Sequence, residues 1–226
     1  MLDELTPNPT IDEQVYARLR QAILAGQLEP GQDLVVSTVA QQLGVSRIPV
    51  MRACHRLVGE GFLLANPRRS LTVVAQTEPR MVEAVEVLLA LECLALEHVA
   101  RAATPEFIRE LRRQNKVVQR FHRPPGSLVM NTADYHFHDL IWTAAGRPYL
   151  REQIKIVYDH HEPARALGRR LHDAGLSAGE HNALIEALAQ HDAAAAQEVI
   201  RRHRQRGLER ALAALREKNG KGAGTP

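Results

Sequence analysis

The segment "GVSRIPVMRACHRL", residues 44–57, limits the possible folds of this chain more than any other stretch. Gly44 is suited to end a short helix over 37–43, because glycine readily adopts the left-handed conformation found after helices. Ser46 is suited to precede a second helix running to about residue 60, and Pro49 falls in its first turn, where a missing N–H costs little. A short helix, a glycine turn and a longer helix predict a helix-turn-helix, whose second helix enters the DNA major groove.

The flanking sequence predicts a winged version of this motif over residues 11–75. Upstream, apolar residues recur at helical spacing in 11–26, and Ser37 is a candidate cap for the short helix. Downstream, two apolar runs flank the polar stretch "NPRRS" and predict a small hairpin with Arg68 and Arg69 at its tip. The alternative is a small helical domain that only packs, but it leaves these two arginines without a structural purpose.

Positive charge is concentrated in this part of the chain. The whole protein of 226 residues has a formal net charge of +3. Residues 16–75 carry seven arginines and three acidic residues, and seven minus three leaves +4. A positive face of this kind suits a polyanion such as double-stranded DNA, although an excess of charge alone is not specific.

The remainder of the chain has the pattern of a helical bundle. Residues 81–102 are apolar on most faces, which predicts a buried helix. Further helices are expected over 104–122, 127–145, 147–168, 177–190 and 192–217. The short breaks between them, at "RPPG", "GRP", "DAGLSAG" and "QHD", favour antiparallel neighbours.

The predicted fold is therefore mostly α, with an N-terminal winged helix-turn-helix followed by an all-helical antiparallel bundle. We expect a flexible N-terminus at 1–10, the winged domain at 11–75, a linker at 76–80 and the helical domain at 81–218. The tail at 219–226 is expected to be disordered.

Several classes of protein are excluded by composition. No apolar run approaches the roughly 18 residues that a membrane helix needs, and the acidic, polar start is unlike a secretory signal. Cys54 and Cys93 are far apart within apolar helical patterns, so two buried free thiols are expected rather than a disulfide. These features predict a cytoplasmic protein without a membrane partner.

One group of polar residues has the composition of a metal site. Asp134 and His138 are four residues apart on a predicted helix and share a face, while His181 and His203 lie on two later helices. A carboxylate and three imidazoles suit a divalent ion such as zinc, nickel or manganese. Because the chain has 11 histidines, spacing alone also allows a buried hydrogen-bonded cluster or exposed side chains.

Longer stretches resemble a known family. "LRQAILAGQLEPGQDL", "VAQQLGVSRIPVMRACHRLVGEGFL" and "NPRRSLTVV" resemble the GntR family of bacterial winged-helix transcription factors. "ADYHFHDLIWTAAGRPYL" and "EHNALIEALAQHDAAAAQEVIRRH" are similar to the FCD ligand-binding domain of its FadR subgroup. The resemblance implies a homodimer, a DNA operator, a small-molecule effector, and a metal at the four matching positions Asp134, His138, His181 and His203.

The DNA-reading segment departs from the family pattern. Ile48, Met51 and Arg52 stand where the family usually has Thr, Arg and Glu, and Ser70 stands where the wing commonly has Gly. Met51 removes a charged contact, for which Arg52 or Arg56 could compensate. The residues expected to contact DNA are Ser46, Arg47, Arg52, Arg56, Arg68 and Arg69.

A second departure concerns the effector. Many relatives place an arginine in the first bundle helix to bind a carboxylate ligand, and Leu88 occupies the comparable position here. Arg165 or Arg169 could bind an organic acid instead, the effector could be less anionic, or the domain could have kept a structural metal alone.

The sequence thus predicts a DNA-binding regulator, with repression favoured, whose operator affinity responds to a small metabolite, with an organic acid favoured, at a metal-containing site. The main alternative is a metal-responsive regulator in which the ion itself is the effector. An enzyme that activates water at the metal is a rival, but no general base is evident beside the ligands. An architectural DNA binder with an inert helical domain is the remaining possibility.

Overall fold

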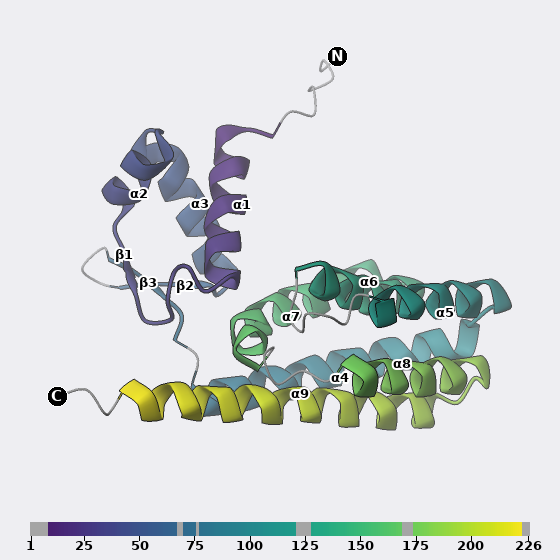
Figure 1. Ribbon diagram of the computed structural model, residues 1–226. Helices are drawn as coiled ribbons and strands as arrows, with labels where there is room; N and C mark the ends of the chain where they lie inside the picture. The colour runs from purple at the N-terminus through teal and green to yellow at the C-terminus, as the bar shows by residue number, and fades with distance from the viewer. Residues whose placement is uncertain (1–8, 67–69, 76, 121–127, 169–173, 223–226) are drawn as a thin grey trace, which may run out of the picture. The chain divides into compact units, whose positions relative to one another are not determined.

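The computed structural model describes residues 9–66, 70–75, 77–120, 128–168 and 174–222 (Figure 1). The chain divides into two units, Met1–Gln76 and Thr77–Pro226. The first combines helices with a small sheet and the second is helical, which confirms the mostly α fold class with its winged and bundled parts.

The described residues of the first unit form three helices and three short strands. They are α1 (Ile11–Leu24), β1 (Asp33–Leu34), α2 (Val36–Leu43), α3 (Arg47–Gly59), β2 (Leu63–Ala65) and β3 (Leu71–Val73). The strands form one antiparallel sheet in the order β1-β3-β2, in which β2 and β3 are the predicted hairpin. Strand β1 was not predicted, because two residues are too few to show an alternating pattern.

Local capping fixes the ends of these helices. Thr10 and Glu13 form a reciprocal capping box at the start of α1. Gly44 follows α2 in the left-handed conformation, with φ of 66°, as the helix-turn-helix requires. The prediction that Ser37 caps α2 is wrong, because the helix begins one residue earlier at Val36. Ser46 does occupy the N-cap position of α3, although its side chain makes no capping hydrogen bond.

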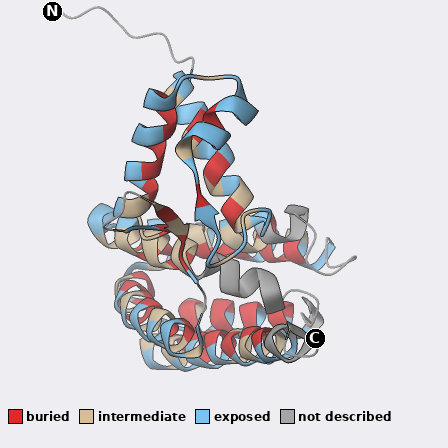
Figure 2. Ribbon diagram, turned by 90° about the vertical axis from the view of Figure 1, so that its left-hand side faces the viewer, coloured by how far each residue is buried: buried red, intermediate tan, exposed pale blue. Residues whose placement is uncertain are grey.

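Apolar side chains from all three helices and the sheet form the core of the first unit. Val50, Cys54 and Leu57 project from α3 at helical spacing and are fully buried. They pack in one cluster with residues of α1 such as Val15 and Leu19. Figure 2 shows buried residues as stripes along these helices, so the opposite face of α3 remains available for a partner.

The described part of the wing is held by side-chain hydrogen bonds. Asn66 donates from Nδ2 to Ser70 Oγ at 3.1 Å and to Thr72 Oγ1 at 2.8 Å, and Thr72 in turn donates to Asp33. These bonds connect the base of the hairpin to β1. Arg68 and Arg69, the predicted contacts at its tip, lie outside the described residues.

The described residues of the second unit form long helices. They are α4 (Glu78–Ala102), α5 (Pro105–Arg120), α6 (Leu128–Ala144), α7 (Pro148–Gly168), α8 (Ala174–Ala189) and α9 (Ala193–Gly222). The predicted break at "DAGLSAG" is wrong from Ala174 onward, because its small residues continue into α8. Helix α4 begins within the predicted linker, and α9 extends into the segment predicted as a tail. In the part of the chain that the structure describes, no helix is both long and apolar enough to cross a membrane.

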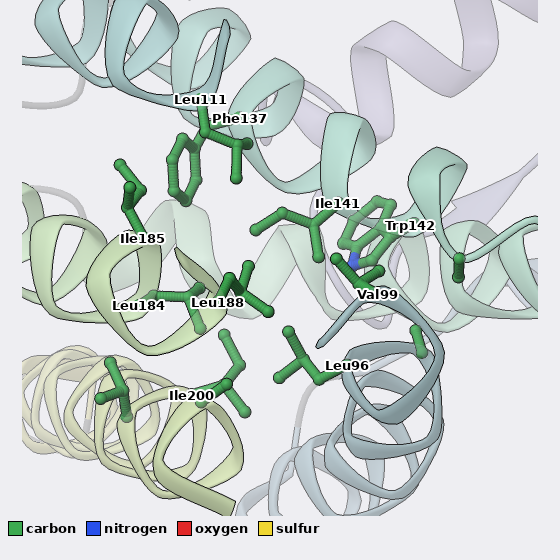
Figure 3. Packing of buried hydrophobic residues seen from close by; sticks show 14 of the residues in the cluster. Leu96, Val99, Leu111, Phe137, Ile141, Trp142, Leu184, Ile185, Leu188 and Ile200 are labelled. Carbon is green, nitrogen blue, oxygen red and sulfur yellow. The ribbon is translucent and has the colours of Figure 1, made fainter. Parts of the chain in front are cut away.

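Helices α4 and α9 pack along each other in opposite directions. Glu78 near the start of α4 pairs with Arg216 near the end of α9, while Glu92 pairs with Arg204 farther along. Side chains from α4, α6, α8 and α9 converge in the core, where Leu96, Ile141, Trp142, Leu184 and Ile200 are buried (Figure 3). This packing brings residues from distant parts of the sequence to one polar site within an apolar interior.

Candidate DNA interface and metal centre

The N-terminal half of α3 presents an exposed surface of mixed polarity. Ser46 and Arg47 are both exposed to solvent. Ile48 and Met51 beside them are 59% and 47% exposed, so two apolar side chains share this surface with Arg47. A charged side chain next to two apolar ones can both pair with DNA acceptors and contact thymine methyl groups.

The other predicted arginines of α3 make contacts within the unit. Arg52 forms an exposed ion pair with Asp12 at 3.0 Å. Arg56 pairs with Glu60 at 2.9 Å and lies 3.7 Å above the ring of Tyr16, whose hydroxyl donates to the same glutamate. Arg56 therefore links α3 to α1, whereas Arg47 has the more open position.

Cys54 is not a reactive group on this surface. It is fully buried, as Cys93 is also buried, and both thiols are free, as predicted. Burial raises the pKa of the Cys54 thiol to about 11. A thiol that remains protonated at neutral pH is a poor nucleophile and metal ligand, so Cys54 contributes packing.

In the second unit, the four predicted metal ligands come together. Asp134 and His138 lie on α6, His181 on α8 and His203 on α9, and one ligand atom from each lies within 4.8 Å of the others. We call these residues the Asp–His cluster. The three histidines are buried, and the aspartate is partly exposed.

The separations within the Asp–His cluster approach those around a single ion. Four atoms bound at about 2.1 Å in a tetrahedral site lie about 3.4 Å from one another. The four ligand atoms lie within 4.8 Å of one another, so the most distant pair would move together by about 1.4 Å or less on binding. His181 Nε2 and Asp134 Oδ1 are 3.6 Å apart, which is close to the tetrahedral separation.

Neighbouring polar groups orient two of the imidazoles. His181 Nδ1 is 3.1 Å from Asn115 Oδ1, and the amide nitrogen of Asn115 donates to Ala178 O and Asn182 Oδ1. The Asn115 oxygen is thus the acceptor, so His181 donates from Nδ1 and directs its Nε2 lone pair into the cluster. A hydrogen bond of this kind is typical of metal-binding histidines.

Glu180 has the same role toward His203. Its Oε2 lies 2.9 Å from His203 Nδ1, and its Oε1 lies 3.1 Å from Arg206. Burial raises the pKa of the Glu180 carboxyl, but the hydrogen bond and charge of His203, together with Arg206 and Arg202, lower it overall. The ionised carboxylate accepts the Nδ1 proton and leaves His203 Nε2 for an ion.

Replacing Glu180 by Gln should weaken zinc binding by about 10- to 100-fold, because His203 loses the carboxylate that orients and polarises it. Competition with a chromophoric chelator measures this affinity. Glu186→Gln is the matched control, since Glu186 is exposed on the same helix and pairs with Arg112. Equal zinc affinity of both variants would show that Glu180 does not support the site.

The structure adds an ion pair that sequence analysis missed. Glu92 on α4 is 2% exposed and accepts two hydrogen bonds from Arg204 on α9, at 2.8 and 2.6 Å. Trp142 donates its indole N–H to the same carboxylate at 3.0 Å. The sequence held a sign of this buried charge, because Glu92 lies four residues from Leu88 and from Leu96, on the apolar face of α4.

A small cavity of about 10 Å³ adjoins both Glu92 of this ion pair and His138 of the Asp–His cluster. Glu92, Leu96, His138, Ile141, Trp142, Leu184 and Ile200 line it. The volume is near the minimum that holds one water molecule. Leu88, which the family resemblance compares with a carboxylate-binding arginine, is fully buried. Arg169 and the side chain of Arg165, the predicted effector contacts, lie outside the described residues.

Two family profiles match the chain. Residues 11–73 match "Bacterial regulatory proteins, gntR family", and residues 83–206 match "FCD domain". The first match covers the helices and strands of the first unit, and the second contains all four members of the Asp–His cluster.

Individual relatives agree with these matches. The chain is 25% identical over 192 residues to the "Uncharacterized HTH-type transcriptional regulator YdhC" of Bacillus subtilis (strain 168), across 84% of this chain and 86% of the relative. It is 25% identical over 150 residues to the gluconate operon transcriptional repressor of the same strain, across 66% of this chain and 60% of that protein. The solved structure of E. coli McbR/YncC is similar in fold, with a TM-score of 0.75 and 22% identity, across 90% of this chain and 98% of that one.

Proposed function

Since the chain belongs to the GntR family of bacterial regulators and carries a C-terminal FCD domain, we propose that it is a homodimeric repressor controlled by a small organic acid at a metal-containing site. Membership of this family makes it a DNA-binding transcriptional regulator rather than an enzyme. Binding to an operator implies that it acts in the bacterial cytoplasm. The name of the gluconate operon transcriptional repressor, one of the relatives, supports repression.

The main support for control by a metal-bound effector is the Asp–His cluster, whose four ligand atoms lie close together. One carboxylate and three imidazoles suit zinc, nickel or manganese, and a bound ion would supply a Lewis acid to which the oxygens of an organic acid bind. Asn115 and Glu180 hold His181 and His203 in the orientation that such binding needs. An effector of this kind shifts DNA affinity by its differential affinity for two states, typically about 1–3 kcal/mol.

In DNA binding, α3 of each protomer would occupy the major groove of one half-site, with half-sites about one helical turn apart. Arg47 is suited to pair with a guanine, and Ile48 and Met51 to contact thymine methyl groups. Ser46 and the arginines of α3 and the wing, namely Arg52, Arg56, Arg68 and Arg69, would contribute phosphate or minor-groove contacts.

Replacing Arg47 by Ala should weaken operator binding by about 1–3 kcal/mol and relax specificity at one base pair. Fluorescence anisotropy on the operator and on single-base variants measures both effects. Arg18→Ala removes the same charge from an exposed position on α1 and is the control. If Arg47→Ala reduced affinity no more than Arg18→Ala and left specificity intact, the proposed groove contact would be wrong.

Thermal unfolding of the full chain against a panel of organic acids, with added zinc and after chelation, tests the control by an effector. An acid that stabilises the protein only when zinc is present, and that also changes operator affinity, is the expected result. A stabilisation by metal alone, with operator affinity following the free metal concentration, would favour the second candidate, a metal-responsive regulator. The buried cluster supports that candidate equally, so the metabolite response decides between them.

A further inference from the structure

The buried ion pair between Glu92 and Arg204 has no evident need in the bundle. Both side chains are almost completely buried, at 2% and 7% exposure, among apolar residues of α4, α6 and α9. Moving two charges out of water offsets most of their attraction, so apolar residues of similar size often stabilise a core as well. A role beyond packing would explain why charged groups occupy this place.

The side chains around Glu92 are arranged as in a protein site that binds the carboxylate of a ligand. Arg204 binds both of its oxygens, through Nε at 2.8 Å and a terminal nitrogen at 2.6 Å. Trp142 adds an N–H donor at 3.0 Å, and the Tyr158 ring lies 5.4 Å from the guanidinium carbon. A planar bidentate arginine with a further directed donor is how proteins bind carboxylates.

Arg204 and Trp142 form the site that holds the Glu92 carboxylate, which we call the carboxylate site. This site adjoins the Asp–His cluster. Arg204 directly follows His203 on α9, and Trp142 lies one helical turn after His138 on α6. The rings of His138 and Trp142 are stacked with centroids 6.1 Å apart, and His138 and Glu92 line the same small cavity. One small molecule could therefore bind an ion at the cluster and place a carboxylate on Arg204.

We propose that Arg204 is the carboxylate-binding residue of the effector site, and that Glu92 is a tethered carboxylate that occupies it until an organic acid takes its place. This inference rests on the proposed control by an effector and names the contact that sets its affinity. Arg204 would then bind the carboxylate of the effector, which the apolar side chain of Leu88 cannot do. Because the cavity beside the pair has the volume of about one water molecule, an acid enters only when the Glu92 side chain leaves.

The exchange also connects the effector to the rest of the chain. Glu92 belongs to α4, which starts at Glu78, soon after the first unit ends at Gln76. Release of Glu92 removes a link between α4 and α9 in the middle of their contact. The two arrangements of α4, with and without this link, are the two states that an effector would select.

Chemical rescue tests the carboxylate site directly: acetate is added to the full chain to replace a deleted Glu92 carboxylate. Glu92→Ala should lower the melting temperature, and acetate in about tenfold excess over its dissociation constant should raise it again by about 3 °C or more beyond equal sodium chloride. Wild-type protein should show no acetate-specific rise, because Glu92 fills the carboxylate site. Leu96→Ala enlarges the same cavity without removing a charge and is the matched control.

A second variant keeps the test decisive if Glu92→Ala does not fold. Glu92→Gln retains the shape but is a weaker competitor for Arg204, so zinc-loaded protein should bind malate about tenfold or more tightly than wild type does. Acetate rescue or tighter malate binding supports the exchange, and absence of both overturns it. If rescue occurs but no acid changes operator affinity in wild type, the carboxylate site is supported, whereas the proposed control by an organic acid is overturned.

Discussion

Replacing Arg204 by Met is expected to lower the free energy of unfolding by about 3–5 kcal/mol. The side chain of Met fills most of the space of Arg, so the loss comes mainly from electrostatics. Glu92 would keep its buried carboxylate but lose both hydrogen bonds from the guanidinium. Urea unfolding followed by circular dichroism measures the change.

Two controls separate burial from pairing. Arg216→Met breaks a bidentate pair with Glu78 between the same two helices, but at an exposed position, so its effect should be much smaller. The double variant Glu92→Leu/Arg204→Met should recover most of the lost stability, because no charge remains buried. A double variant as unstable as Arg204→Met alone would show that shape, and not charge, makes this position sensitive.

Replacing His138 by Ala is expected to weaken zinc binding by about two orders of magnitude or more. Binding free energies of about 10–16 kcal/mol for zinc sites with four ligands correspond to about 3 kcal/mol for each ligand. The loss should appear in chelator competition, and zinc should no longer stabilise the variant against thermal unfolding.

His136→Ala is the matched control, since His136 is exposed on α6 two residues away. It should bind zinc as wild type does. Because His138→Ala also removes a buried ring, the variants are compared as differences between zinc-loaded and chelated protein. An equal zinc-dependent stabilisation in both variants would place the metal elsewhere.

Much of the architecture could be predicted from local sequence. Gly44 in the left-handed conformation and Ser46 at the start of α3 are consequences of backbone preferences at single residues, so the helix-turn-helix was evident. The hairpin also followed from two apolar runs around a turn. Strand β1 was missed because two residues are too few to show an alternating pattern. The first residues of α8 were missed because small residues and glycines are typical of a loop.

The Asp–His cluster was predicted as a set of residue types, with the family resemblance selecting the positions. Spacing along one helix pairs Asp134 with His138, but periodicity carries no information on which helices meet. The approach of His181 and His203 to within 4.8 Å of the other two ligand atoms is a result of the packing of α8 and α9 against the rest of the bundle.

The sequence by itself determined the helices, the turn that makes α3 a reading helix, and the chemical types available for a metal site, because these depend on backbone preference, periodicity and residue identity. Only the tertiary structure decided that Glu180 orients His203 and that Glu92 occupies the guanidinium of Arg204. Those contacts join residues 23 and 112 positions apart in the chain. Their geometry exists only once the helices have packed, since buried charge is tolerated where a partner is held in place.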